Sequence, residues 1–400
     1  MEEFKIVKLP TKEENKEEDV PVEKTDDNYQ PPKKKHIFLF LIFLFVIIGV
    51  MVIRIITTYT DYEVVNKWDR KETSESSYCN FKNNLLKYSC DGVFYTTYAG
   101  NLIWNYTYDM TNPNMDICGD YVIVYDKKGN EIDLFNSSGF VKTITCTTPI
   151  IEAKVAKQGT MALLLQENGV SHIQLFDKSG TTLVSGEFHP ENRGFPVSIA
   201  LSSDATRLLM SVINVDQGEL STELVFYDFT NAGKEEQDNI IASYTYVGML
   251  VPKIDYVDKD KVIAFGDSKI IIFNNNLKAT MAKEIPVDNV KSVFYNDKYF
   301  GFVKEATAED GSVVNELNVY NLFGFKWMSK EITDSYEQIS ILDNNEILLN
   351  DNGKIAIYNM QGFKKFEYDF GERIYTVLPG NTHKKYYLIE ENKTEEIYIK

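Results

Sequence analysis

The chain has 400 residues, of which 59 are Asp or Glu and 42 are Lys or Arg, and its formal net charge is −17. An acidic surface repels polyanions, so this composition argues against nucleic acid as a partner. The length is enough for one large domain built from repeats or for two ordinary domains.

The N-terminal tail, residues 1–36, is rich in Lys and Glu and contains few aromatic side chains. Such a segment buries too little apolar surface to offset the entropy lost on ordering, which predicts disorder. Residues 37–56 follow as an apolar run that only Arg54 interrupts. As a helix this run is about 30 Å long, which is the thickness of the hydrocarbon core of a bilayer.

We expect Ile37–Ile56 to remain in the protein as a membrane anchor. A cleavable signal peptide is the main alternative, but a long polar tail precedes the run and no Ala-x-Ala-like cleavage site follows it. Lys33, Lys34 and Lys35 adjoin its N-terminal end, so the positive-inside rule predicts a cytoplasmic tail and an extracytoplasmic C-terminal domain. All four cysteines follow the anchor, as suits an oxidising compartment. The expected location is therefore the cell membrane, crossed once.

Residues 57–77 are polar and mixed in charge, which indicates a juxtamembrane stalk with one strand near Tyr62–Trp68. From residue 78 to residue 400 the pattern changes. Short alternating runs rich in Val, Ile, Tyr and Phe are separated by Gly, Asn or Asp about every 8–12 residues, with no amphipathic helix among them. Residues 78–400 are therefore predicted to form a domain of many short antiparallel strands.

A repeat runs through these strands. An apolar residue, an aromatic residue and then Asp or Asn precede a turn that usually contains Gly. The clear copies carry the aromatics Phe135, Phe176, Tyr227, Phe273, Tyr320 and Tyr358, and Tyr98 and Tyr398 mark two weaker copies. A period of roughly 40–50 residues with four strands per unit is typical of propeller blades. The aromatic is expected to fill the space between neighbouring sheets, and the Asp or Asn to begin the turn.

The predicted fold is an all-β propeller of four-stranded antiparallel blades, preceded by one transmembrane helix. Eight blades are preferred, and seven result if the two terminal copies form one blade. The last unit offers only three strands, at Ile374–Leu378, Lys385–Ile389 and Glu396–Ile399. Tyr62–Trp68 could supply its fourth strand, which would close the ring and remove an exposed edge.

Several stretches resemble a known family. They are Asn84–Gly92 (NLLKYSCDG), Leu102–Tyr106 (LIWNY), Cys118–Ile123 (CGDYVI), Leu201–Leu208 (LSSDATRL) and Val262–Asp267 (VIAFGD). With them the chain resembles an uncharacterised family of single-pass, membrane-anchored propellers of Gram-positive bacteria, with blades similar to those of quinoprotein-like and WD40-like propellers. The resemblance implies topology and placement, and no activity, because a fold does not specify a function.

Catalytic and metal-binding patterns are scarce. The four histidines are well separated, no Cys-x-x-Cys occurs, and no Gly-x-Ser-x-Gly or phosphate-binding Gly loop is present. Quinone enzymes of the resembled fold use adjacent cysteines and a floor of tryptophan, whereas the cysteines here are dispersed and only three tryptophans exist. We therefore expect no catalytic residues, no metal and no cofactor.

Two pairs of cysteines invite a disulfide hypothesis. Cys79 and Cys90 flank a predicted hairpin and could bridge its two strands. Cys118 and Cys146 fall on the innermost and outermost strands of one blade, too far apart to join. A Cys79–Cys90 disulfide is therefore predicted.

Three long polar connections form the candidate recognition surface. His189–Pro196 joins one unit to the next, and Asn214–Thr222 and Glu305–Val314 each join a second strand to a third, so all three emerge on one face of a propeller. Loops on a rigid scaffold commonly carry binding groups, although insertion drift explains them equally well. The candidate binding residues are His189, Glu191, Arg193, Asp216, Glu219, Glu309 and Asp310.

Three functions remain open at this point. The first is a non-catalytic binding or scaffolding module outside the membrane that engages a protein or an envelope polymer through these loops. The second is a receptor that passes an external signal to the N-terminal tail. The third is a propeller enzyme with a site in the central channel.

Overall fold

The computed structural model describes residues 34–70, 76–189, 194–216, 218–275, 279–308 and 311–400. The chain divides into two compact units, Met1–Arg54 and Ile55–Lys400. Of the tail predicted to be disordered, residues 1–33 lie outside the described part. Helix α1 (Lys34–Ile56) begins three residues before the predicted span, because hydropathy marks where a helix is apolar rather than where it starts.

The segment Phe38–Ile56 of α1 has a mean hydropathy of 3.1, and none of it is buried. Its 19 residues are long and apolar enough to cross a membrane. A signal sequence meets the same criteria of length and composition.

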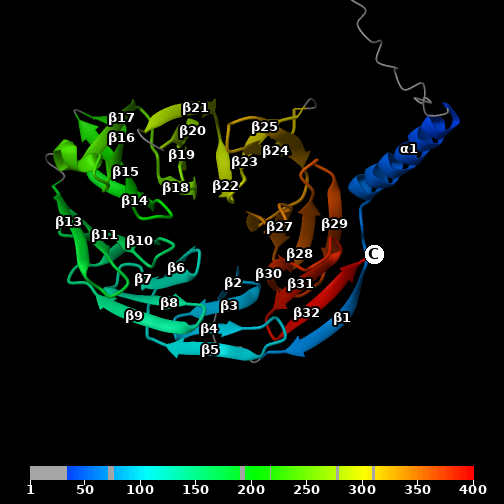
Figure 1. The fold of residues 1–400 in the computed structure, drawn as a ribbon, viewed down its shortest axis with the longest axis horizontal. Helices are drawn as coiled ribbons and strands as arrows, with labels where there is room; N and C mark the ends of the chain where they lie inside the picture. The colour runs from blue at the N-terminus through cyan, green and yellow to red at the C-terminus, as the bar shows by residue number, and fades with distance from the viewer. Residues whose placement is uncertain (1–33, 71–75, 190–193, 217, 276–278, 309–310) are drawn as a thin grey trace, which may run out of the picture. The chain divides into compact units, whose positions relative to one another are not determined.

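The second unit is a ring of eight four-stranded antiparallel sheets (Figure 1), so the predicted all-β propeller and the preferred count of eight blades are confirmed. Within each blade the first strand lies at the centre of the ring and the last at its edge. From inner to outer strand, blade 1 contains β2 (Ser77–Phe81), β3 (Asn84–Ser89), β4 (Gly92–Thr96) and β5 (Leu102–Thr107); blade 2 contains β6 (Pro113–Cys118), β7 (Tyr121–Asp126), β8 (Glu131–Asn136) and β9 (Gly139–Thr145); blade 3 contains β10 (Ile150–Val155), β11 (Met161–Glu167), β12 (Val170–Phe176) and β13 (Thr182–Phe188); and blade 4 contains β14 (Phe195–Leu201), β15 (Arg207–Asp216), β16 (Glu219–Asp228) and β17 (Ile240–Val247).

The other half of the ring follows the same order. Blade 5 contains β18 (Lys253–Asp258), β19 (Lys261–Phe265), β20 (Lys269–Asn274) and β21 (Thr280–Pro286); blade 6 contains β22 (Val290–Tyr295), β23 (Tyr299–Thr307), β24 (Val313–Asn321) and β25 (Lys326–Ile332); blade 7 contains β26 (Gln338–Ile341), β27 (Ile347–Asp351), β28 (Lys354–Tyr358) and β29 (Lys364–Asp369); and blade 8 contains β30 (Ile374–Pro379), β31 (Lys385–Glu390), β32 (Lys393–Ile399) and β1 (Tyr62–Asp69). Two 3-10 helices, η1 (Gly233–Glu235) and η2 (Gln237–Asn239), join β16 to β17.

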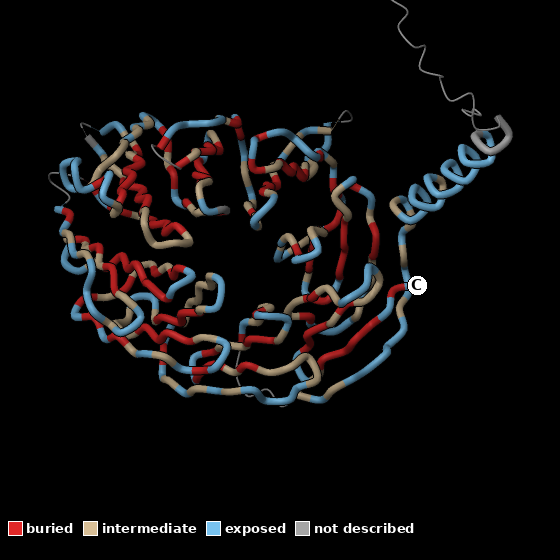
Figure 2. The backbone as a smooth tube through the Cα atoms, viewed as in Figure 1, coloured by how far each residue is buried: buried red, intermediate tan, exposed pale blue. Residues whose placement is uncertain are grey.

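The core lies between neighbouring blades, where the middle strands are almost wholly buried (Figure 2). Leu163 of blade 3, for example, belongs to the same buried cluster as Ile132 of blade 2. Phe226 and Phe273 meet between blades 4 and 5, with ring centroids 5.0 Å apart. These inter-blade clusters form because the middle strands are nearly continuous apolar runs, as in β11 and β20, so both faces of each middle strand are hydrophobic.

The aromatic residue of the repeat is the last or the penultimate residue of the third strand, and all six clear copies are buried, as predicted. The Asp or Asn that follows it begins the turn through its side chain. Asp177 Oδ1 accepts hydrogen bonds from the backbone N–H groups of Ser179 and Thr181, at 2.9 and 2.8 Å. Asn321 and Asn359 accept the equivalent pairs of bonds in blades 6 and 7.

The two weak copies of the repeat were placed less well. In blade 1 Thr97 begins the turn, so the residue at the aromatic position is Thr96 and not Tyr98. Near the C-terminus Tyr398 is 37% exposed, and Ile397 and Ile399 are buried in its place. Both errors arise because the marker was chosen by its closeness to a turn. The equivalent residue is set by the pairing of the strands, which the sequence does not show.

The ring closes through its N-terminal strand, as the sequence predicted. Strand β1 pairs antiparallel with β32, from Tyr62 opposite Ile399 to Asp69 opposite Lys393. Just before it, Tyr59 pairs in parallel with β29, donating its N–H to Lys365 at 2.8 Å. Residues 58–70, predicted as part of a stalk, are therefore bonded to blades 7 and 8.

Candidate functional site

Two features of the ring carry candidate function: the wall of the central channel and the face on which long hairpins project. We call that face the arm face, after the long hairpins described below. It carries the turns between second and third strands and the crossings between blades. The opposite face, which carries the turns between first and second and between third and fourth strands, is the turn face. The two kinds of turn alternate because each blade is an antiparallel meander.

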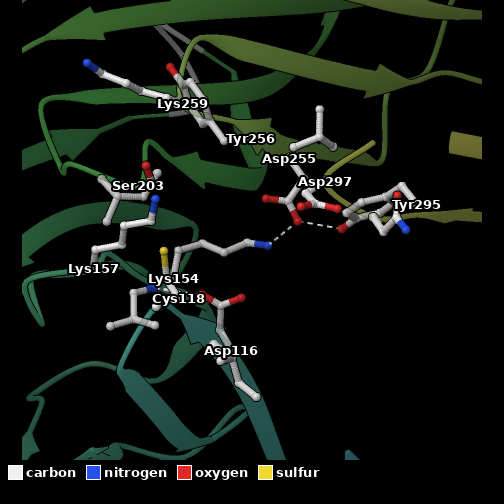
Figure 3. Close-up of a pocket in the computed structure, with 16 residues that line it drawn as sticks. Asp116, Cys118, Lys154, Lys157, Ser203, Asp255, Tyr256, Lys259, Tyr295 and Asp297 are labelled. Carbon is white, nitrogen blue, oxygen red and sulfur yellow. Dashed lines mark hydrogen bonds and ion pairs between the residues drawn. The ribbon is translucent and has the colours of Figure 1, made fainter. Parts of the chain in front are cut away.

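A cavity of about 570 Å³ lies where the inner strands of blades 2 to 6 reach the turn face (Figure 3). Its labelled lining residues are Asp116, Cys118, Lys154, Lys157, Ser203, Asp255, Tyr256, Lys259, Tyr295 and Asp297. Acidic and basic side chains both line it. The channel wall therefore carries charges of both signs, whereas the chain as a whole is strongly negative.

Lys154 is the central cation of this wall. Its Nζ lies 2.9 Å from Asp255 Oδ2 and 3.9 Å from Glu152 Oε1, and its side chain is 13% exposed. Asp255 Oδ2 also accepts a hydrogen bond of 2.5 Å from the hydroxyl of Tyr295 (Figure 3). The contacts join blade 3 to blades 5 and 6 across the channel.

The neighbouring carboxylates bind backbone amides of the next blade. Asp116 in blade 2 accepts the N–H of Val155 in blade 3 at 2.8 Å. Glu152 in blade 3 accepts the N–H of Ile199 in blade 4, also at 2.8 Å. These bonds satisfy acceptors that burial would otherwise leave without water, and they hold adjacent inner strands in register.

Burial perturbs the titration of the cluster. Burial raises the pKa of Asp116 to about 6, against the opposing charge of Lys154. Burial raises the pKa of Glu152 as well. For Lys154, burial acts to lower the pKa, but the carboxylates of Asp255, Asp116 and Glu152 outweigh it and raise the pKa overall. The ammonium is therefore charged at every physiological pH.

Sequence reasoning did not find this cluster. The signal was present in the sequence of the inner strand β10, where Glu152 and Lys154 are two residues apart and so share one face. Asp116 and Asp255 occupy equivalent places on other inner strands. Charged residues at alternate positions of an inner strand indicate a polar channel wall, but their partners come from other blades and cannot be read locally.

A second buried acid lies outside the channel. Asp133 on β8 is fully buried, its Oδ1 accepts the hydroxyl of Thr143, and its Oδ2 has no partner among the described residues. Burial raises the pKa of Asp133 to about 6, which the Thr143 hydroxyl only partly offsets.

Replacing Asp133 with Asn is expected to change how stability depends on pH. Because the folded pKa exceeds the unfolded value, the contribution of Asp133 to stability is full below about pH 4 and is lost as the pH rises to about 6. The free energy of unfolding of Asp133→Asn, relative to that of the wild type, should therefore rise by about 2–3 kcal/mol from pH 4 to pH 8. Denaturant unfolding across this range measures it, and parallel stability curves for the two proteins would contradict it.

The predicted recognition loops are mostly strands. β15 pairs with β16 as far as Asp216 opposite Glu219, whereas β14 starts opposite Ile213. β23 pairs with β24 as far as Thr307 opposite Val313. We call the projecting parts the arms: residues 214–216 with 219–221, and 305–307 with 313–315. Polar residues hid the strand alternation, because both sides of an arm face solvent.

Two of the seven candidate binding residues have side chains that the structure describes. Glu219 is exposed at the first arm, and His189 is exposed with its Nε2 3.6 Å from Glu187 Oε2. The residues Glu191, Arg193, Glu309 and Asp310, and the side chain of Asp216, lie outside the described part of the chain. The arms also carry apolar side chains that sequence reasoning missed: Val215 is 69% exposed and Val313 is 65% exposed.

The predicted Cys79–Cys90 disulfide is not formed, and all four cysteines are free. Across the hairpin Cys79 faces Leu86, and Cys90 lies beyond the end of β3. The turn at Lys82 and Asn83 sets this register, so the two sulfurs do not oppose each other. Burial raises the pKa of Cys79 to about 12, which keeps this thiol protonated and unreactive. Among the described residues, no three His, Cys, Asp or Glu side chains are grouped to hold a metal ion.

Comparison with solved structures shows the fold alone, since the identities are low. BamB from Moraxella catarrhalis matches with a TM-score of 0.51 and 12% identity, over 85% of this chain and 98% of its own. The WD40 domain of Pan2 from Neurospora crassa matches with a TM-score of 0.43 and 8% identity, over 72% and 88%. The β-propeller domain of the Trilobed protease from Pyrococcus furiosus matches with a TM-score of 0.43 and 14% identity, over 72% and 93%.

No curated protein sequence matches the chain. Residues 55–399 match a family model described as "Family of unknown function (DUF5711)". The matched residues include all eight blades, so the chain belongs to the DUF5711 family of unknown function.

Proposed function

We propose that this protein is a non-catalytic binding module that α1 anchors in a cell membrane, with the propeller outside the cytoplasm and the arms engaging a protein partner. The resemblance noted in the sequence suggests the envelope of a Gram-positive bacterium as its setting. The observation that carries the proposal is the pair of arms, which project beyond the short hairpins of the other blades and expose Val215 and Val313 at their tips.

Exposed apolar side chains on a rigid support are typical of protein-recognition surfaces. Phe195 and Val247 lie on the same face of blade 4 as Val215 and are 45% and 63% exposed. Among the described residues, Asn214 and Val215 extend past the start of β14 and have no ladder partner on that side. Such an edge can pair with an extended segment of another protein. A protein partner fits these features better than an envelope polymer, which would need polar contacts.

The channel supports a structural role rather than catalysis. Lys154, Asp255 and Tyr295 are bonded to one another, and Asp116 and Glu152 hold backbone amides of the neighbouring blades. Because these side chains are already bonded within the channel wall, they hold the inner strands together. The cavity nevertheless makes a small-molecule site the second candidate function, because acids of raised pKa gather at active sites as well as in structural networks.

Photo-crosslinking in intact cells tests the binding proposal. A photoreactive phenylalanine replaces Val215 or Val313 in the full-length protein, and the same residue replaces Lys128 on the short hairpin of blade 2 as a control on the same face. Both arm positions are expected to form the same discrete adduct, and the control none. Adducts of equal yield at all three positions, or at none, would contradict the proposal.

Placing negative charge at the tips of the arms gives a second test of the binding proposal, with a control of equal charge. The double variant Val215→Glu with Val313→Glu lowers the net charge by two units, as does Lys128→Glu alone. Loss of the adduct, probed from a third photoreactive position at Phe195, is expected only for the arm variant. The topology is tested separately: a tag after Lys400 should be cleaved by protease added to spheroplasts, and a protected tag would contradict an extracytoplasmic propeller.

A further inference from the structure

The turn face of blades 6 and 7 carries a group of exposed aromatic side chains that the arms and the channel do not involve. Phe323 and Phe325 lie in the turn before β25 and are 67% and 70% exposed. Trp327 on β25 is 52% exposed, and Phe363, in the equivalent turn of blade 7, is 41% exposed. We call these four residues the aromatic sector.

The two turns are neighbours on the ring. Lys330 of β25 donates from Nζ to the carbonyl of Gly362 at 2.6 Å, next to Phe363. On the other side, Lys261 Nζ lies 4.3 Å from the centroid of the Phe323 ring. Lys326 separates Phe325 from Trp327 and is exposed. The sector therefore combines aromatic rings with lysines, which is the composition of protein surfaces at a membrane–water interface.

The chain that follows the apolar helix reaches the ring at this sector. The hydroxyl of Thr58 donates to the carbonyl of Lys364 at 2.7 Å, and Lys364 directly follows Phe363. Thr58 is two residues after Ile56, the last residue of the candidate span. Two residues of extended chain reach about 7 Å, so the end of the span is tethered close to Phe363.

From this tether we infer that the aromatic sector lies in the interfacial zone of the bilayer that α1 crosses, and so docks the propeller on the lipid surface by its turn face. The inference rests on the proposed membrane anchoring. Rings of Phe and Trp enter the boundary between headgroups and acyl chains, while the exposed Lys326 reaches the phosphates. The arms, on the opposite face, then point away from the bilayer and toward a partner.

Quenching of Trp327 fluorescence by lipid tests the docking. The full chain is reconstituted in vesicles of phosphatidylcholine, with and without bromine on the acyl chains near the headgroup. Helix α1 contains no Trp, and the difference between wild type and Trp327→Phe isolates Trp327 from Trp68 and Trp104. We expect loss of roughly half of the Trp327 emission, as for a ring that enters about 5–10 Å into the interface.

A tryptophan on the arm face is the control. Val215→Trp in the Trp327→Phe background should show no quenching by the same lipids. Flotation after alkaline extraction reports the anchoring independently: a chain that does not float refutes the anchor. A chain that floats while Trp327 stays unquenched refutes the docking alone. A third outcome also refutes the docking. If lipid does not quench Trp327, but an aqueous quencher loses access to it as protein density rises, a second copy of the protein covers the sector.

Discussion

Deleting Tyr62–Asp69 from the full-length chain is expected to abolish cooperative folding of the propeller. The deletion removes the whole ladder between β1 and β32, which contains seven residue pairs and one bulge between Val64 and Asn66. At about 1 kcal/mol net for each hydrogen bond, the loss is of the same order as the total stability of a domain. Far-UV circular dichroism with thermal unfolding measures the effect, and a transition unchanged from wild type would contradict it.

The seam between blades 8 and 1 makes this strand decisive. Among the described residues, the buried apolar cluster at this seam is the smallest of the eight inter-blade clusters, with Leu85, Leu378 and Ile389 at its centre. Stacked tyrosines such as Tyr98 and Tyr387, with centroids 4.2 Å apart, supply much of the remaining contact. Tyr62 adds a contact to blade 7, with its ring centroid 4.8 Å from that of Tyr368. Because β1 lies in blade 8 and the chain runs from it directly into blade 1, its pairing with β32 compensates for the weak core between these two blades.

A peptide covering residues 57–70 separates the role of the strand from other effects of the deletion. Added in trans, it is expected to restore a cooperative transition, because it can pair with the free edge of β32. Without it, the exposed edge should cause association that rises with protein concentration, measured by sedimentation. A deletion of residues 2–30, which removes no described contact, is the matched control and should unfold like the wild type.

Replacing Lys154 with Met is expected to cost about 3–5 kcal/mol at neutral pH, because it leaves the carboxylates of Asp255, Asp116 and Glu152 buried without their cation. Methionine keeps most of the volume, so the loss reports on charge rather than packing. The cost should shrink as the pH falls and Asp116 and Glu152, whose pKa values burial raises, become protonated. Denaturant unfolding of the full chain in detergent measures the difference.

Two further variants identify the cause. Lys154→Met with Asp255→Asn should recover part of the lost stability, because one uncompensated charge is then removed. Lys128→Met removes a lysine from an exposed turn and should change stability by less than about 0.5 kcal/mol. Equal losses for Lys154→Met and Lys128→Met would show that the channel network is not stabilising.

The repeat made the architecture predictable, because its physical causes are local. In six blades an Asp or Asn begins the turn after the third strand, and the aromatic residue just before it fills the gap to the preceding blade. Asp177 and Phe273 show both requirements. The closing strand was predictable for a different reason: the last unit lacked one strand, and only Tyr62–Trp68 remained to supply it.

The channel network and the arms were not predictable, because each depends on residues far apart in the sequence. Lys154 meets Asp255 only after the ring has closed around both. The arms looked like loops because no buried face imposed alternation on residues 214–221. The aromatic sector was missed because the repeat drew attention only to the aromatic before Asn321, and the exposure of Phe323 and Phe325 after it is seen only in the structure.

The pairing of β1 with β32 also has a consequence for biosynthesis. The ribosome makes the closing strand before any blade and makes its partner last, so the first strand waits through translation of more than three hundred residues. A truncated product would lack β32 and keep an open edge, which proteases and chaperones can recognise. Closure of the ring therefore requires that translation has passed β32, and until then the unpaired strand edges of the nascent chain stay open to proteases and chaperones.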